Sequence, residues 1–461
     1  MRITILTYGS RGDVQPFLAL AIGLQKAGYQ LKLAAPHRFE SFVTANNVPF
    51  VPLAGDPEVI SQRLNDAGAN PLGMLRAMSD YIFSIADQVA RKAFDACTDA
   101  DLIIHSFLFT TGGHSLARKL GIPDVSVQTF PIFAPTRAFP PVSMPDLPPG
   151  SLSYFFHWLT TQIFWHGGNM GFRRLRKADL DTFDLKLYWP FHTDGSRLRT
   201  PLVLAYSPTV VTRPDDWSAP HIHIPGYLFL ESPDSYQPPV ALTDFLSAGK
   251  PPVCVSFGSM IHHDAERIYC VVFDALRRTG NRAVVLSGWS DLSRSGAVEL
   301  LAEQSADVLV MDAVPHDWLL PRCKAMIHHG GAGTTAAGLR SGIPNLVVSF
   351  AADQPFWGAR VRAIGAGPQP IPVKKLTAEK LIAALVEAGG DAVRNGALAT
   401  GRKIRAEDGV RTAVKLIEEY AVNGQKSYKS VLVIKRLNTV SYISQSRLAN
   451  SLGDKPGQGN P

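Results

Sequence analysis

The chain has 461 residues, of which 46% are hydrophobic and 18% are charged, a composition that suits two or three globular domains with sizeable cores. Its formal net charge of +7 is concentrated in residues 423–461, where six basic residues and one acidic residue leave +5. The rest of the chain carries about +2, which argues against a protein that binds nucleic acid.

The first half of the chain alternates short apolar strands with helical segments. Its first helix is expected to begin near Pro16 and to end at Gly28, with proline at its start and glycine at its end. Because this βαβα order is typical of a doubly wound fold, it predicts a parallel sheet. The expected elements are strands at 3–7, 31–35, 101–104 and 125–128 and helices at 16–27 and near 114–120.

Residues 129–200 interrupt this alternation with prolines, then aromatic residues, then a basic run. Two interpretations remain open: an ordinary insertion with a buried aromatic face, or one wall of a lipophilic pocket that also touches a membrane. The aromatic residues are Tyr154, Phe155, Phe156, Trp158, Phe164 and Trp165, and the basic ones are Arg173, Arg174, Arg176 and Lys177.

A second α/β unit follows a proline-rich linker at 232–245. We therefore expect an N-terminal Rossmann-like domain over 1–231, a C-terminal one over 246–422, and a basic flexible tail over 423–461. The final helix is placed so that it could pack back on the N-terminal domain. In the second unit the expected strands are 253–257, 283–286, 308–311, 325–328 and 346–349, and the expected helices are 264–278, 334–340, 354–364, 377–387 and 410–420.

The most informative segment, from His328 to Thr335, reads HHGGAGTT and lies between a strand and a helix. Its glycines remove side chains where the chain turns, so the backbone N–H groups of the new helix can face an anion. His329 can add a donor, while His328 points to the opposite side of the strand and is interpreted as structural. Asp353 and Gln354 offer polar groups suited to hydroxyls. Phosphate beside hydroxyls indicates a nucleotide sugar.

The loop after the first strand, from Tyr8 to Pro16, is not a GxGxxG motif, so a dinucleotide fingerprint is not supported. It holds one carboxylate, Asp13. One interpretation makes Asp13 the N-cap of the helix near Pro16, and the other makes it a general base for an attacking hydroxyl.

Four motifs together resemble the UDP-glucose:sterol glucosyltransferases, within the family-one glycosyltransferases of GT-B fold. The resemblance covers roughly residues 1–420 and implies two Rossmann-like domains whose parallel sheets face each other across a cleft. It also implies an inverting transfer in a single displacement without a bound metal. The motifs lie at 10–16 (SRGDVQP), 315–321 (PHDWLLP), 328–335 (HHGGAGTT) and 353–357 (DQPFW).

The resemblance also implies roles for single residues. Asp13 becomes the catalytic base. The donor-binding positions are Ser10 and Arg11 near the donor, Val314 and His316 at the nucleobase, His329, Ala332, Gly333 and Thr334 at the diphosphate, and Asp353 and Gln354 at the sugar hydroxyls.

Departures from related branches leave ribose and acceptor recognition open. Where the plant secondary-metabolite branch has a ribose-binding glutamate, this chain has Ala337, and where that branch has a histidine base it has Asp13. Ser259 and Trp289 follow strands and are candidates for lining the cleft. No metal site is expected, because the sequence has no Asp-x-Asp pair in a glycine-flanked loop and a helix N-terminus can stabilise leaving UDP without Mg²⁺.

The sequence therefore predicts transfer of glucose from UDP-glucose to a hydroxyl of a lipophilic acceptor, with a sterol favoured and no further cofactor. The alternatives are another hexose or deoxyhexose placed on a polyketide or glycolipid, or a non-catalytic protein that binds nucleotide sugars. No apolar run spans eighteen residues, and four scattered cysteines lack a CxxC pair, which indicates a cytoplasmic protein. The basic tail is either a peripheral membrane contact or a solvated segment without a role.

Overall fold

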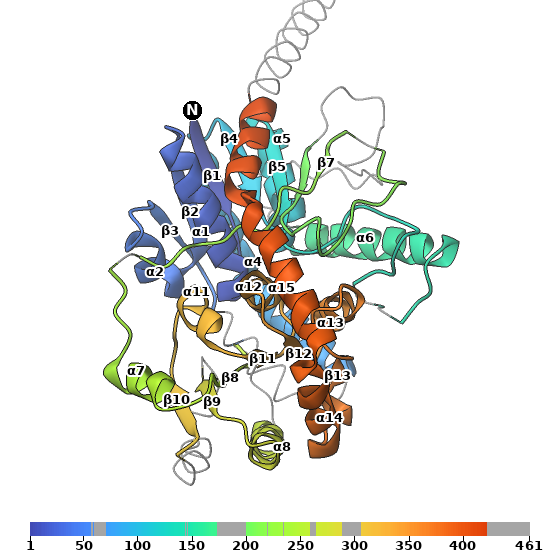
Figure 1. The fold of residues 1–461 in the computed structure, drawn as a ribbon. Helices are drawn as coiled ribbons and strands as arrows, with labels where there is room; N and C mark the ends of the chain where they lie inside the picture. Colours follow the sequence, from blue (N-terminus) through green and yellow to red (C-terminus); the bar gives the residue numbers. More distant parts are fainter. Residues whose placement is uncertain are drawn as a thin grey trace, which may run out of the picture.

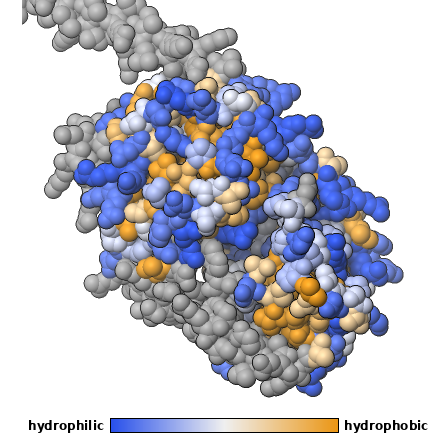
Figure 2. Space-filling model, turned by 90° about the vertical axis from the view of Figure 1, so that its left-hand side faces the viewer, coloured by the Kyte–Doolittle hydropathy of each residue, from blue (hydrophilic) through white to orange (hydrophobic). Residues whose placement is uncertain are grey.

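The structure is a computed structural model that describes residues 1–56, 59, 71–142, 144, 146–172, 200–218, 220–233, 235–258, 264–287 and 306–421. Within these ranges the chain forms two parallel sheets flanked by helices, and the N-terminal sheet lies above the C-terminal one in Figure 1. The side of the molecule shown in Figure 2 has apolar patches in both halves, set among hydrophilic side chains.

The N-terminal sheet has the order β3-β2-β1-β4-β5-β6-β7, and all its pairs are parallel. The four predicted strands are confirmed to within about one residue, whereas β3, β6, β7 and the long helix α4 were not predicted. The strands are β1 Arg2–Leu6, β2 Gln30–Pro36, β3 Phe50–Leu53, β4 Leu102–His105, β5 Asp124–Gln128, β6 Leu202–Leu204 and β7 Ile222–His223. The α-helices are α1 Arg11–Lys26, α2 Glu40–Thr44, α4 Pro71–Cys97, α5 Thr110–Leu120 and α6 Ser151–Phe172.

The C-terminal sheet has the order β10-β9-β8-β11-β12-β13 and is also parallel. Its strands are β8 Val253–Ser256, β9 Ala283–Leu286, β10 Val308–Met311, β11 Ala325–His328, β12 Asn345–Ser349 and β13 Ile371–Pro372. The helices are α7 Val240–Ser247, α8 Ala265–Arg278, α11 His316–Leu319, α12 Ala332–Ser341, α13 Gln354–Ala363, α14 Ala378–Gly389, α15 Asp391–Ala406 and a last helix at 409–421.

The structure differs from the expected elements at two places. The predicted linker, 232–245, includes the start of α7. Because Leu242 of this helix is buried in the C-terminal core, the segment between the two halves is shorter than expected. The first helix begins at Arg11 rather than near Pro16, because Ser10 serves as its N-cap and Pro16 lies inside the helix. Asp13 is therefore not an N-cap but the third residue of the helix.

The last helix crosses back to the N-terminal half, where it runs beside the first sheet in Figure 1. Ala413, Val414 and Ile417 belong to the same apolar cluster as Phe17 and Leu24 of α1. Just before this helix the Glu407 carboxylate accepts hydrogen bonds from Ser207 Oγ at 2.6 Å and Thr209 Oγ1 at 3.0 Å. The two halves are thus tied together by both apolar and polar contacts.

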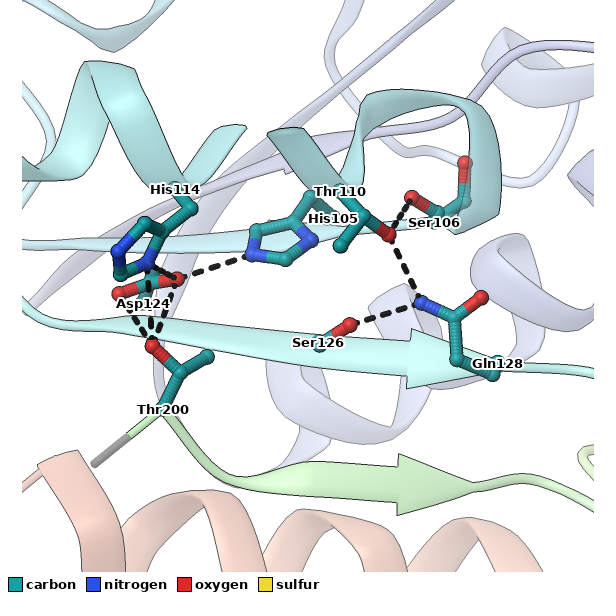
Figure 3. Close-up of polar contacts among 8 residues, drawn as sticks. All are labelled: His105, Ser106, Thr110, His114, Asp124, Ser126, Gln128 and Thr200. Carbon is teal, nitrogen blue, oxygen red and sulfur yellow. Dashed lines mark hydrogen bonds and ion pairs between the residues drawn. The ribbon is translucent and has the colours of Figure 1, made fainter. Parts of the chain in front are cut away.

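A buried polar network lies under α5 on one face of the N-terminal sheet. Figure 3 shows His105, His114 and Asp124 pointing toward one another from β4, α5 and β5. His105 Nε2 and His114 Nδ1 lie 3.0 and 2.9 Å from Asp124 Oδ2, and Thr200 Oγ1 donates to Asp124 Oδ1 at 3.1 Å. Burial alone would raise the pKa of the Asp124 carboxyl, but the two histidines hold it well below its usual range. Asp124 therefore stays ionised inside the core.

Asp124→Asn is expected to lower the free energy of unfolding by about 1–3 kcal/mol. The reason is that the amide NH₂ group, which replaces one carboxylate oxygen, cannot accept a hydrogen bond from a buried imidazole N–H. Urea unfolding of the purified chain measures this change. A matched control is Asp274→Asn, since Asp274 pairs with Arg277 and Arg278 on the surface of α8 and should cost less than about 1 kcal/mol. Equal losses in the two variants would contradict this view of the network.

Candidate active site

Both sheets reverse their strand order at one point, and ligands of open α/β sheets bind beyond the carboxyl ends of the strands at such points. In the N-terminal sheet the reversal lies between β1 and β4, and in the C-terminal sheet it lies between β8 and β11. The helix that follows β1 carries Asp13 in its first turn, and the loop after β11 carries His329. Each sheet therefore places one predicted site residue at its switch point.

The Asp13 carboxylate is held by the start of its own helix. Ser10 donates to Asp13 Oδ2 through its backbone N–H at 2.8 Å and through its hydroxyl at 3.0 Å, while Thr7 Oγ1 donates to the Asp13 carbonyl at 2.8 Å. Gly9 has a φ of +133°, and a Cβ atom there would overlap Asp13 Oδ2. Burial raises the pKa of Asp13, and the Ser10 hydrogen bonds oppose that shift. The result is a half-buried, fixed carboxylate.

The glycine-rich turn opens α12 as the sequence predicts. Gly331 is the N-cap, and no side chain caps this helix. A Cβ atom at Gly333 would meet nothing within 4 Å, so the first turn of α12 faces open space. His328 is fully buried and accepts a hydrogen bond from the Gly330 N–H at 3.1 Å, which is a structural contact. The backbone N–H groups in the first turn of α12 and the positive end of its dipole together form a candidate anion-binding site.

His329 lies at the edge of this candidate anion-binding site. The ring can take this position only because residue 331 is a glycine, since a Cβ atom at Gly331 would overlap His329 Nε2. Burial lowers the pKa of His329 to about 4, the backbone of Ser256 opposes this shift, and His316 adds to it. At pH 7 the ring is therefore neutral and carries one N–H, which can donate either to the backbone of Ser256 or to a bound anion.

Asp353 and Gln354 start α13, but they are held differently. Asp353 Oδ2 accepts a hydrogen bond from Trp357 Nε1 at 2.8 Å, and Trp357 is fully buried. Burial raises the pKa of Asp353 to about 6, the Trp357 bond opposes this shift, and the charge of Asp13 adds to it. Gln354 Oε1 accepts from the backbone N–H groups of Phe350 and Ala351 at 2.7 and 3.2 Å. The oxygen of Gln354 thus holds its own loop.

Charge effects and helix packing together indicate which predicted residues come together. Burial is the main cause of the raised pKa of Asp353, and the charge of Asp13 adds to it, so the two carboxyl groups lie within electrostatic range of each other. Arg11 helps burial to lower the pKa of His316 to about 4. Helix α1 also contacts α12. The start of α1 and the turns of the second sheet therefore form one site.

Other predicted residues are less directly placed. Val314 is 5% exposed and packs in the apolar cluster with Leu319, so its side chain belongs to the core. His316 begins α11, where the neighbouring Asp317 accepts hydrogen bonds from Ser232 N at 2.8 Å and Ser232 Oγ at 2.6 Å. Ser259 and Trp289 lie outside the described residues.

Two family models match separate parts of the chain. Residues 3–138 match the N-terminal domain of glycosyltransferase family 28, and residues 293–412 match the C-terminal domain of proteins like erythromycin biosynthesis protein CIII. The first match contains Asp13, and the second contains the glycine-rich turn and Asp353.

Curated relatives match most of the chain. Two sterol 3-beta-glucosyltransferases of Arabidopsis thaliana are 37% and 33% identical to it over 90% of its length, and the chain spans 65% and 67% of theirs. A sterol 3-beta-glucosyltransferase of Candida albicans is 33% identical over 95% of the chain, which spans 29% of that protein.

Solved structures share the fold at low sequence identity. The glycosyltransferase of kitacinnamycin superposes with a TM-score of 0.67 at 20% identity, covering 91% of this chain and 98% of the other. The calicheamicin glycosyltransferase CalG4 gives a TM-score of 0.65 at 18% identity, with 91% and 98% covered. Both halves of the chain therefore have the GT-B architecture. Together with the similarity to the plant and fungal enzymes, this shows that the chain belongs to the sterol 3-beta-glucosyltransferase family of GT-B glycosyltransferases.

Proposed function

We propose that this chain transfers glucose from UDP-glucose to the hydroxyl of a sterol, with inversion at the anomeric carbon and without a bound metal ion. The observation that carries the proposal is the contact between α1, whose first turn holds Asp13, and α12, whose uncapped start faces open space. The names of the similar plant and fungal proteins supply the sugar and the acceptor class.

In this proposal the donor lies along the second sheet. The diphosphate faces the first turn of α12, from Ala332 to Thr334, with His329 as a further donor. Asp353 accepts hydrogen bonds from sugar hydroxyls. Arg11, at the start of α1, lies within electrostatic range of His316, at the start of α11, and in this proposal the nucleotide end of the donor passes them.

The chemical step is a single displacement. Asp13 takes the proton of the acceptor hydroxyl while that oxygen forms a bond to the anomeric carbon. The bond from that carbon to the phosphate oxygen breaks, and its electron pair leaves with UDP. The positive end of α12 and the His329 N–H stabilise the negative charge that grows on the diphosphate.

Binding of UDP-glucose is expected to weaken as the pH falls through about 6. The pKa of Asp353 is raised to about 6, so its hydroxyl-accepting carboxylate is present above this pH and is lost below it. Calorimetric titration of UDP and UDP-glucose from pH 5 to 8 measures the effect. Asp353→Asn should weaken UDP-glucose binding more than UDP binding and remove this pH dependence. Equal losses for both ligands would place Asp353 on the nucleotide.

Two alternatives remain to be separated from this proposal. One is transfer of another hexose or deoxyhexose to a polyketide or glycolipid, and a similar solved glycosyltransferase of Streptomyces sp. SF2575 is complexed with thymidine diphosphate rather than UDP. The other is a non-catalytic protein that binds nucleotide sugars, which would not need a base at Asp13. A panel of donors and acceptors analysed by mass spectrometry separates them. A sterol product one hexose heavier, formed only with UDP-glucose, supports the proposal.

We also propose that the protein is cytoplasmic and touches membranes peripherally. The predicted basic tail, 423–461, lies outside the described residues, and its charge alone suggests a contact with anionic lipid worth about 1 kcal/mol per basic residue at the surface. Truncation after Asn423 is expected to leave transfer to a soluble acceptor intact and to reduce sedimentation with anionic vesicles, most strongly at low salt. Unchanged vesicle binding would assign the tail no membrane role.

A further inference from the structure

Helix α6 has polar side chains on its buried side and apolar side chains on its exposed side, which is the reverse of an ordinary surface helix. Its buried side carries Ser153, His157, Thr161 and Trp165 at four-residue spacing, and these are at most 4% exposed. Ser153 Oγ donates to the carbonyl of Phe139 at 3.0 Å, and His157 Nε2 lies 3.0 Å from the same oxygen. Polar side chains therefore fix this helix to the body of the protein.

The outer side of α6 is apolar. We call the exposed residues Leu152, Phe155, Trp158 and Ile163, which are between 41% and 61% exposed, the α6 apolar face. Of the six aromatic residues that one sequence interpretation placed in a buried face, three are exposed, Tyr154 and Phe156 are half-buried, and only Trp165 is buried. A helix on a water-exposed surface normally places its polar side outward, so this orientation needs an apolar partner.

The composition of α6 points to lipid. Its 22 residues include no Asp, Glu, Lys or Arg, whereas a protein interface usually has a polar rim of hydrogen-bonding groups. Trp and Phe are the residues that settle at the boundary between lipid headgroups and acyl chains. Within the described ranges, no helix is long and apolar enough to cross a bilayer, so a contact through α6 would lie in the surface.

The base of α6 also carries a cation. The guanidinium of Arg137 lies 4.8 Å from the ring centre of Tyr154, near the start of the helix, and Arg137 is exposed. A basic side chain beside an apolar helix face matches the phosphate layer that borders the acyl chains. Figure 1 shows α6 projecting away from the N-terminal sheet.

A series of aromatic contacts runs from the protein-facing side of α6 into the protein. The ring of Phe164 lies 4.8 Å from that of Phe107, which lies 5.1 Å from Phe130 and 5.9 Å from Phe133. Phe107 follows β4, and Phe130 follows β5, so these rings lie at the carboxyl ends of the strands. This is the edge of the sheet from which the Asp13 loop also emerges.

We propose that the α6 apolar face docks on the surface of a lipid bilayer, and that Phe164 and Phe107 begin the route by which a lipophilic acceptor leaves the bilayer for the active site. The docking stands on the geometry of α6 alone. The route rests on the proposed function, because only a membrane-dissolved acceptor needs it.

The test compares two double variants that each replace two exposed apolar residues with serine. Phe155→Ser with Ile163→Ser removes the centre of the α6 apolar face without touching the Phe164–Phe107 contact. The matched control, Val386→Ser with Leu398→Ser, changes residues that are 68% and 44% exposed on α14 and α15. Sedimentation with phosphatidylcholine vesicles at high salt excludes the electrostatic contribution of the tail.

The wild type and the control are expected to bind these vesicles equally. The α6 variant is expected to bind at least about tenfold more weakly, because it lacks two apolar side chains that docking would bury in the bilayer. Transfer to a detergent-solubilised sterol should be unchanged in the α6 variant, while transfer to vesicle-embedded sterol should fall. Equal vesicle binding by all three proteins, or a wild type that ignores neutral vesicles, overturns the proposal.

Two further results separate the possibilities. A wild-type dimer in solution that the α6 variant loses would make this face a protein interface and overturn the lipid assignment. Loss of vesicle binding in a variant whose wild type shows no transferase activity would support docking while refuting the proposed function. UDP binding measured in all three proteins verifies that each is folded.

Discussion

Replacing Asp13 with asparagine is expected to lower kcat by roughly 10²-fold or more while leaving the affinity for UDP nearly unchanged. Asparagine keeps the shape of the side chain and an oxygen that can still accept the Ser10 N–H, so the first turn of α1 should persist. What it removes is the carboxylate that, in the proposed mechanism, takes the acceptor proton. The change therefore separates catalysis from helix capping.

Steady-state kinetics with UDP-glucose and a sterol measure this effect, and thermal unfolding monitors the fold. Because burial raises the pKa of Asp13, the wild-type rate should fall on the acid side at a higher pH than an ordinary aspartate would give. A matched control is Asp101→Asn, since Asp101 pairs with Arg2 at the other end of β1. Wild-type turnover by a folded Asp13→Asn protein would leave Asp13 with the capping role only.

His329→Ala is expected to slow transfer by about 10²–10³-fold, the usual cost of losing one donor to a developing anion. The ring is neutral near pH 7, so the loss is that of an N–H donor and not of a full charge. UDP binding should also weaken. His329→Gln, which restores an N–H group, should recover part of the rate.

Activity in the presence of EDTA is the companion measurement. In the proposed mechanism α12 and His329 carry the leaving-group charge, so a chelator should not change the wild-type rate. If EDTA abolished activity, a metal would carry that charge and the mechanism would be wrong, whatever the His329 variants did.

The sequence was informative wherever backbone chemistry is local. Glycine-rich turns and apolar runs predicted β8 to β12 closely, and the turn at Gly330 and Gly331 predicted the uncapped start of α12. The start of α1 was misplaced because Pro16 was taken as a first-turn residue, although Ser10 supplies a capping group earlier in the chain. Two signals for a helix start lie close together there, and the helix begins after Ser10 rather than at Pro16.

Features that depend on distant partners were not predictable. The pairing of Asp353 with Trp357 had no separate signal, and neither did the electrostatic effect of Asp13 on Asp353, which belong to different halves of the chain. The buried network had one usable signal, the alternation of Asp124, Ser126 and Gln128 in a strand that is otherwise apolar. Such alternation indicates a strand with one polar face, and here that face is buried under α5.

The central claim is best tested by incubating the purified chain with ¹³C-labelled UDP-glucose and a 3β-hydroxysterol, with EDTA present, and recording the NMR signal of the anomeric carbon in the product. The account predicts one glucose per sterol in the β configuration, equimolar release of UDP, and no product from Asp13→Asn. Product of the α configuration, or binding of UDP-glucose without any transfer across the acceptor panel, would contradict it.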